Sequence, residues 1–87
     1  MIEVIFFSGS NCGVCQVMKP KLLEAIEKNF CNLDFKIVSI EDNVEFTAQH
    51  LVFTLPVLII KVDGNERKRF VRSFGVNEVV DFLHRII

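Results

Sequence analysis

Two cysteines three residues apart, Cys12 and Cys15, are the side chains of this sequence best suited to chemistry. Cysteines at this spacing serve redox chemistry or supply part of a metal site. They fall where an apolar segment ends and a helical pattern begins, and the first turn of a helix stabilises an anion. We therefore expect the Cys12 thiol to lose its proton more readily than a free thiol. Cys15, one helical turn further on, should lie near enough to close a disulfide.

Two other interpretations of the cysteine pair stay open at this point. Buried thiols also act as small hydrophobic side chains, and such a pair can supply half of a zinc or iron–sulfur site. A zinc site needs two further ligands, and the spacings of Cys31, His50 and His84 fit no common zinc motif. We expect Cys31 to be a half-buried filler just past the first helix, and both histidines to lie on the surface.

The cysteine pair is positioned by a predicted strand, helix and second strand. Residues Ile2–Phe7 are almost wholly apolar, which predicts a strand buried on both faces. Apolar residues recur every three or four positions from 12 to 29, which predicts a helix capped by Asn11. Asp34–Ile40 is rich in β-branched residues and predicts the second strand. Because such crossovers are right-handed, the two strands should be parallel, with the helix on one face.

The rest of the chain predicts a short helix on the other face of the sheet, a hairpin and a final helix. These elements are a helix at about Val44–Leu51, strands at Val57–Val62 and about Glu66–Arg72 joined by a turn at Asp63-Gly64, and a helix at Val76–Ile87. No repeat, low-complexity tract or linker interrupts the pattern. We therefore expect one compact α/β domain over residues 1–87.

The composition argues against several classes of partner. The 87 residues include 10 Lys and Arg against 11 Asp and Glu, so the net charge of −1 gives no field that attracts nucleic acid or an anionic membrane. The longest apolar run, Leu55–Ile60, is far shorter than the roughly 18 to 20 residues that cross a bilayer. The segment Met1–Phe7 has no basic region or cleavage site of a secretory signal, so we expect a cytoplasmic protein.

Four features together resemble the thioredoxin superfamily over essentially the whole chain. They are Cys12-Gly13-Val14-Cys15 after an apolar strand, Pro20 five residues further on, Thr54-Leu55-Pro56 before the third strand, and Asp63-Gly64 in the hairpin. The resemblance implies a minimal, glutaredoxin-sized thioredoxin fold, with a four-stranded mixed sheet of order 4-3-1-2 flanked by three helices. It also implies a cis Leu55–Pro56 bond that faces the dithiol.

The same resemblance implies a thiol–disulfide oxidoreductase that reduces protein disulfides, with Cys12 as the nucleophile and Cys15 as the resolving thiol. Its partners would be substrate proteins with disulfides and a reductase that supplies electrons. We expect a monomer with no cofactor or metal besides the redox-active disulfide. The residues expected to contact the substrate are Gly13, Val14, Leu55 and Pro56.

The sequence departs from the thioredoxin pattern at positions that matter for catalysis. Phe6 stands where a buried aspartate usually assists proton transfer at the second cysteine, and Ile37 stands where its lysine partner is expected. Asn11 and Val14 replace the usual tryptophan and proline. These departures lend some weight to an alternative function, a non-catalytic thioredoxin-fold module that binds proteins through the same groove. A zinc or iron–sulfur carrier is a further alternative.

Two other groups of residues outside the dithiol have an expected role. Basic residues on the predicted fourth strand should protect a sheet edge from aggregation. Phe53 and Phe74 lie next to the loops around the dithiol and could supply an apolar floor for a partner. The basic residues are Arg67, Lys68, Arg69 and Arg72.

Overall fold

A computed structural model describes all 87 residues and contains four strands and three helices. In chain order they are β1 (Ile2–Ser8), α1 (Gly13–Asn29), β2 (Leu33–Ser39), α2 (Val44–Gln49), β3 (Val57–Val62), β4 (Asn65–Val71) and α3 (Val76–Ile86). Every predicted element is present, with ends that differ from the predicted ones by at most two residues.

The four strands form one mixed sheet of order β2-β1-β3-β4, which is the predicted order read from the other edge. β1 pairs with β2 in parallel and with β3 antiparallel, and β3 and β4 form the antiparallel hairpin. The thioredoxin-type topology expected from the sequence is therefore confirmed. Because β1 and β2 are parallel, their carboxyl ends meet at one edge of the sheet, where the loops after both strands lie together.

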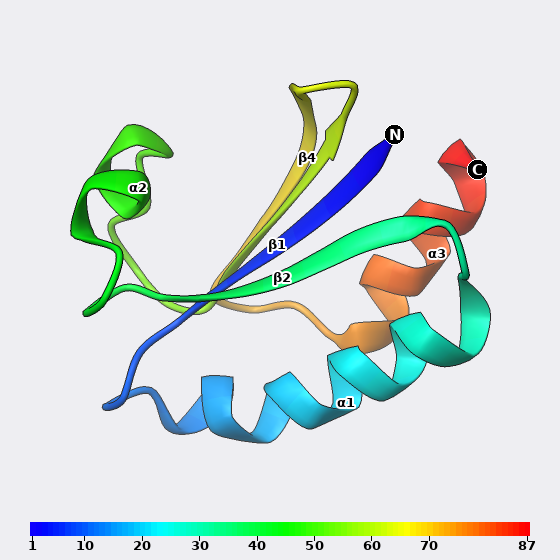
Figure 1. Cartoon of the computed structure of the whole chain (residues 1–87). Coiled ribbons are helices and arrows are strands. Elements are labelled where there is room, and N and C mark those ends of the chain that lie inside the picture. Colours follow the sequence, from blue (N-terminus) through cyan, green and yellow to red (C-terminus); the bar gives the residue numbers. More distant parts are fainter.

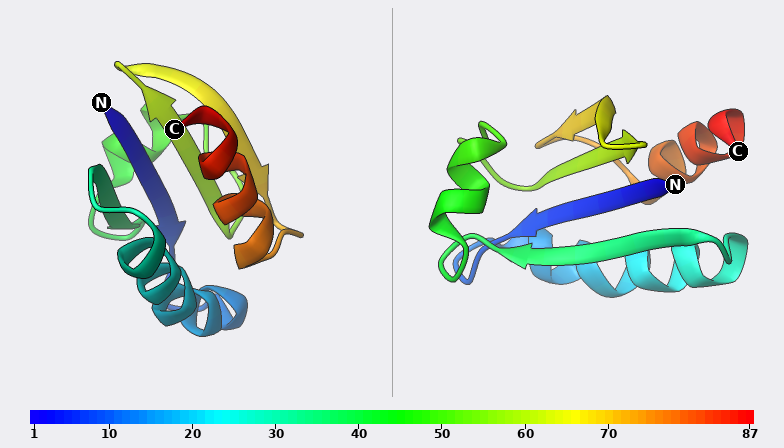
Figure 2. Two further views of the ribbon diagram at one scale, coloured as in Figure 1. Left: turned by 90° about the vertical axis from the view of Figure 1, so that its right-hand side faces the viewer. Right: turned by 45° about the horizontal axis from the view of Figure 1, so that its top comes forward.

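Helices cover the two faces of the sheet unequally (Figure 1). α1 and α3 lie on one face, over a core cluster of ten buried residues that includes Phe6 and Cys15. α2 lies at one end of the other face, over a smaller cluster of six buried residues, and its Phe46 stacks on Phe7 of β1. The two chain ends lie near each other at the end of the molecule away from α2 (Figure 2).

The start of α1 differs from the prediction in its cap. Cys12, not Asn11, is the N-cap residue, and its sulfur accepts a hydrogen bond from the backbone amide of Cys15 at 3.2 Å. The predicted Asn11 cap is therefore wrong by one residue, because the sulfur takes the amide that a polar cap would have bonded. Pro20 lies inside α1, and the helix continues beyond it to Asn29. None of the helices is long and apolar enough to span a bilayer.

Candidate active site

The two cysteines occupy the first turn of α1 and are joined by a disulfide, with their Cα atoms 5.2 Å apart. β1 brings the chain to this point, and a short turn in which the Cys12 amide donates to the Gly9 carbonyl leads into the helix. The side chain of Cys15 is fully buried in the larger core, whereas Cys12 is only partly buried. The outer sulfur is therefore the one that a second molecule can reach.

The loop before β3 faces the dithiol from across the sheet edge. The Leu55–Pro56 peptide bond is cis, and Pro56 is buried while Leu55 stays partly exposed. The loop packs closely on the turn before α1, because a Cβ at Gly9 would lie only 2.8 Å from Leu55 Cδ1. No loop or side-chain hydrogen bond of the chain uses the backbone groups of Leu55, which leaves them for a bound segment.

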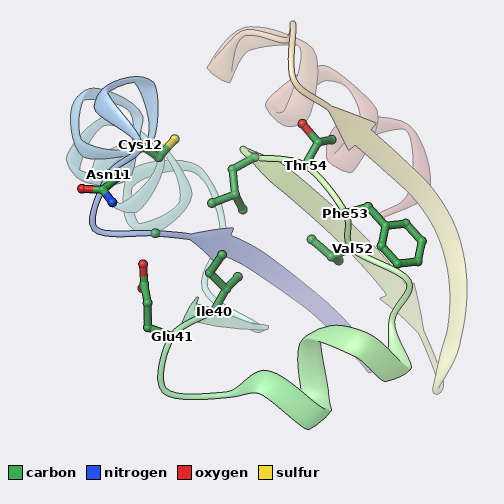
Figure 3. Close-up of a pocket in the computed structure, with 9 residues that line it drawn as sticks. Asn11, Cys12, Ile40, Glu41, Val52, Phe53 and Thr54 are labelled. Carbon is green, nitrogen blue, oxygen red and sulfur yellow. The ribbon is translucent and has the colours of Figure 1, made fainter.

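A groove of about 510 Å³ runs beside Cys12 between these two loops. Figure 3 shows Glu41 on one side of the groove, pointing toward the segment before Cys12, and Phe53 on the opposite side. The Phe53 side chain is 85% exposed, so it serves the surface and not the core. The groove is lined by Gly9, Asn11, Cys12, Ile40, Glu41, Val52, Phe53, Thr54 and Leu55.

Glu41 is the residue of this groove that the sequence analysis missed. Its carboxylate accepts hydrogen bonds from the Ser10 amide at 2.9 Å, the Ser10 hydroxyl at 3.0 Å and the Ser39 hydroxyl at 3.1 Å. The bonds from Ser10, followed by that from Ser39, lower the pKa of the Glu41 carboxyl. Topology could have revealed it: Glu41 follows β2 and Ser10 follows β1, and parallel neighbouring strands end at the same edge.

The other side of the dithiol is apolar and open. Gly13 and Val14 are both exposed, and nothing would obstruct a Cβ at Gly13. Val17 continues the exposed apolar strip one turn along α1, and a second hollow separates this strip from Val76 at the start of α3. Of the predicted contact residues, Gly13 and Val14 line this second hollow and Leu55 lines the groove beside Cys12, while Pro56 is buried and lines neither.

No acidic residue is buried in the structure with Cys15. Phe6 is fully buried in the same core cluster as Cys15, and its register partner on β2 is Ile37. The two positions at which the resemblance places an aspartate and a lysine are therefore neighbours across β1 and β2, and both are apolar. Glu41, on the groove side, is the only charged residue among the nine that line the groove.

Two predictions about the remaining titratable side chains were wrong. Cys31 is a free, exposed thiol in the connection between α1 and β2 and not a half-buried filler. His50 is partly buried at the end of α2, where Nδ1 lies 2.9 Å from the Phe46 carbonyl oxygen and Nε2 lies 2.8 Å from Lys61 Nζ. His84 is exposed as predicted, with its ring 4.8 Å from that of Phe30. No three His, Cys, Asp or Glu side chains gather where they could hold a metal ion.

A cysteine pair at the start of a helix, opposite a cis-proline on a four-stranded mixed sheet, defines a thioredoxin-fold dithiol protein. Comparison with known sequences agrees: the thioredoxin family model matches residues 2–85. The chain belongs to the thioredoxin family. The cysteine pair and the family together indicate thioredoxin-like redox activity, and members of this family are disulfide oxidoreductases.

Individual relatives are similar along nearly the whole chain. The thioredoxin-like protein YdfQ of Bacillus subtilis is 29% identical over 94% of this chain and 72% of its own length. A thioredoxin of Mycoplasma genitalium is 22% identical over 93% of this chain and 78% of its own length. The structure of thioredoxin 1 from Thermosipho africanus superposes with a TM-score of 0.88 at 32% identity, covering 97% of this chain and 92% of that one.

Proposed function

We propose that this chain reduces disulfide bonds in proteins, with Cys12 as the nucleophile and Cys15 as the resolving thiol. The observation that carries the proposal is the disulfide between a reachable Cys12 and a buried Cys15 at the start of α1, beside a groove. The amide of Cys15, which points at the Cys12 sulfur, and the positive end of the α1 dipole would both stabilise a Cys12 thiolate.

The reaction has two exchange steps. The Cys12 thiolate attacks one sulfur of the substrate disulfide, that bond breaks, and the second substrate sulfur leaves as a thiolate that takes up a proton. Cys15, once deprotonated, attacks the Cys12 sulfur of the mixed disulfide, and the substrate's remaining sulfur leaves and is protonated. Two electrons pass to the substrate, and the Cys12–Cys15 disulfide is formed.

The substrate would bind as an extended segment. The unpaired backbone groups of Leu55 would bond to its main chain, as an added strand does. Pro56 would hold this backbone opposite the dithiol, while Gly13 and Val14 would contact the segment beside the attacked sulfur. A reductase in the cytosol would return the oxidised protein to the dithiol, and we expect the chain to act as a monomer.

Trapping of the mixed disulfide tests the assignment of the two cysteines. The test uses a Cys31→Ser background, which removes the exposed third thiol. In this background, Cys15→Ser should accumulate a covalent adduct with insulin whose disulfides are intact. Non-reducing gels and intact mass detect the adduct. Cys12→Ser should form none, because Cys15 is fully buried. Adducts of equal yield in both variants, or in neither, would contradict the assignment.

The apolar Phe6 and Ile37 favour a second candidate function, a module that binds proteins without redox turnover. Equilibration against glutathione buffers, with free thiols read by alkylation and mass spectrometry, separates the two. A potential near or below about −250 mV supports a reductase-fed reductant, and one above about −200 mV supports an oxidant or isomerase. If no Cys12–Cys15 disulfide forms at any redox potential of the glutathione buffer, the protein is the binding module.

A further inference from the structure

We propose that the groove beside Cys12 selects disulfides flanked by a basic side chain, and that Glu41 makes this selection. The inference rests on the proposed function, because it names the substrate class of the same groove. The occupant is an extended segment of a protein with a lysine or arginine on the side of Glu41 and an apolar residue on the side of Phe53 (Figure 3).

The carboxylate of Glu41 is fixed in place before a substrate arrives. One of its oxygens accepts two hydrogen bonds from Ser10, and the other accepts one from the Ser39 hydroxyl. A carboxylate offers about four acceptor positions, so three are used and roughly one is left. The free position is on Oε1, the oxygen that bonds to Ser39, while Oε2 is held against Ser10, two residues before Cys12. A charge held at a fixed point discriminates between partners without a further cost in side-chain entropy.

The negative charge of Glu41 has no cationic partner within the chain. The four ion pairs of the structure join other residues, and none of them includes Glu41. Lys19 lines a separate hollow, which Gly9 and Glu41 also line. Lys19 does not line the groove beside Cys12. A basic group of the substrate would therefore find an unpaired carboxylate, and an acidic one would be repelled.

The opposite side of the groove is apolar. Phe53 is almost fully exposed, and Ile40, Val52 and Leu55 form the apolar surface between it and Glu41. An extended segment directs alternate side chains to opposite sides. A segment bonded to the backbone of Leu55 can thus present one side chain to the Phe53 ring and the next to Glu41. Gly9 lets the Leu55 side chain approach the turn before α1, since a Cβ there would lie 2.8 Å from Leu55 Cδ1 and Leu55 would have to shift.

The test compares two probe peptides in single-turnover reduction. Each is the symmetric disulfide of a short peptide with one cysteine, flanked on both sides by lysine in one probe and by glutamate in the other. The reduced Cys31→Ser protein is mixed with excess probe at low ionic strength, and acid-quenched samples are read by mass spectrometry. We expect the lysine probe to be reduced about tenfold faster than the glutamate probe, with the ratio falling at high salt.

Glu41→Gln should reduce the ratio of the two rates to about twofold or less, whereas Glu27→Gln should keep it. Glu27 is a matched control, because it is an exposed glutamate of α1 outside the groove and its replacement changes the net charge equally. Equal slowing of both probes by Glu41→Gln, with the ratio retained, would show that Glu41 only holds the loop and would overturn the inference. Equal rates for both probes in the original chain would also overturn it while the proposed function stands. If neither probe is reduced, the result contradicts both the proposed function and the inference.

Discussion

Cys15 is enclosed by apolar side chains, and this enclosure shapes the chemistry at the residue scale. The thiol is fully buried in the same core cluster as Phe6, and no carboxylate is buried with it to accept its proton. Burial in apolar surroundings disfavours the thiolate. The first exchange step uses the thiolate of Cys12, which is partly exposed and is not disfavoured by burial in this way. We therefore expect the second step, in which Cys15 releases the product, to limit turnover.

The two exchange steps should separate in time. In stopped-flow mixing of the Cys31→Ser protein with a disulfide substrate at pH 7, we expect the mixed disulfide to accumulate in the unmodified Cys12–Cys15 pair, because attack is faster than resolution. Its decay should accelerate as the pH is raised toward 9, since hydroxide then removes the Cys15 proton that no side chain accepts. Acid quenching, alkylation and intact mass follow the intermediate.

Two results together would contradict the prediction that resolution by Cys15 limits turnover. If the mixed disulfide never exceeds a few per cent of the protein at pH 7, and insulin is reduced at the rate of an ordinary thioredoxin, a proton acceptor for Cys15 must exist. The Cys15→Ser variant is the reference in this experiment, since its intermediate should persist at both pH values.

The residues of the site differ in how far the sequence could predict them. Cys12 and Cys15 were predictable because their roles depend on local features, namely their spacing and their place at the start of a helix. Glu41 was predictable only through the parallel pairing of β1 and β2, because its role arises from hydrogen bonds to Ser10, 31 residues away along the chain. His50 was predicted wrongly for the same reason, since its partner Lys61 lies on another element.

At the scale of elements, Arg69 joins the edge strand β4 to the end of α2. Its guanidinium donates to the His50 carbonyl at 2.7 Å and to the Leu51 carbonyl at 3.1 Å, and it pairs with Glu66 at 2.9 Å. Leu51 has a φ of 55°, so the chain leaves α2 through a left-handed residue that these bonds hold. The segment that follows contains Phe53 and the rest of one groove wall.

Replacement of Arg69 by alanine should therefore loosen both α2 and the groove. We expect Arg69→Ala to lower the free energy of unfolding by about 1–2 kcal/mol, because two carbonyls lose a charged donor. The rate of substrate reduction should fall as well. Arg67→Ala, at an exposed position of the same strand with no hydrogen-bond partner, should stay within about 0.5 kcal/mol. Urea unfolding and a reduction assay measure the two effects.

Arg69→Lys separates charge from geometry in this contact. A lysine keeps the charge beside Glu66 but cannot present the planar fork that reaches two carbonyls and a carboxylate. We expect most of the loss seen in Arg69→Ala to persist in Arg69→Lys. Full rescue by lysine would mean that the ion pair alone, and not the bonds to His50 and Leu51, holds the end of α2.

Element ends were less predictable than the elements themselves. The apolar periodicity of α3 and the apolar run of β1 fixed their type, since burial selects the same residues. The start of α1 was displaced by one residue because a cysteine sulfur caps it, a role that sequence rules assign to short polar side chains. α2 ends at Gln49, two residues before the predicted end, where Leu51 takes a left-handed conformation.

At the scale of the whole molecule, the sheet order was predictable from the family resemblance, and the chain path agrees with it. A right-handed crossover between β1 and β2 and a tight hairpin between β3 and β4 leave few alternatives. The groove was not predictable in this way, because three separate segments form it. They are the turn after β1, the loop after β2 and the loop before β3, which meet only in the folded chain (Figure 3).

The face of the sheet that α2 leaves uncovered is polar and not apolar. Along this part of β1 and β2, Lys36 lies 3.4 Å from the Glu3 carboxylate and 3.6 Å from that of Asp34. These pairs are exposed to solvent, so each contributes little to stability. They let this part of the sheet face the solvent, since an apolar layer in their place would need a further helix to cover it.

Three carboxylates with a lowered pKa link the stability of the fold to pH. The N-terminal amine lowers the pKa of Asp63, and the other two, Glu41 and Glu66, are held by side chains and loops within the fold. Hydrogen bonds from Ser10 lower the pKa of Glu41, and the hydrogen bond from Arg69 lowers that of Glu66. Because all three are lower in the folded chain than in the unfolded one, the unfolded chain binds more protons in acid. Their contribution is complete above the unfolded glutamate value of about 4.3, and it is lost as the pH falls through the lower folded values.

We therefore expect the melting temperature to be nearly constant from pH 7 to about pH 5 and to fall between about pH 5 and pH 3. The double variant Glu41→Gln and Glu66→Gln should melt lower at pH 7 and show a shallower acid decline, because its two amides do not titrate. Glu27→Gln, which removes a glutamate without a hydrogen-bond partner, should keep the original slope. Thermal unfolding followed by circular dichroism at half-unit pH steps tests this, and parallel curves for the double variant and the original chain would show that other groups control acid stability.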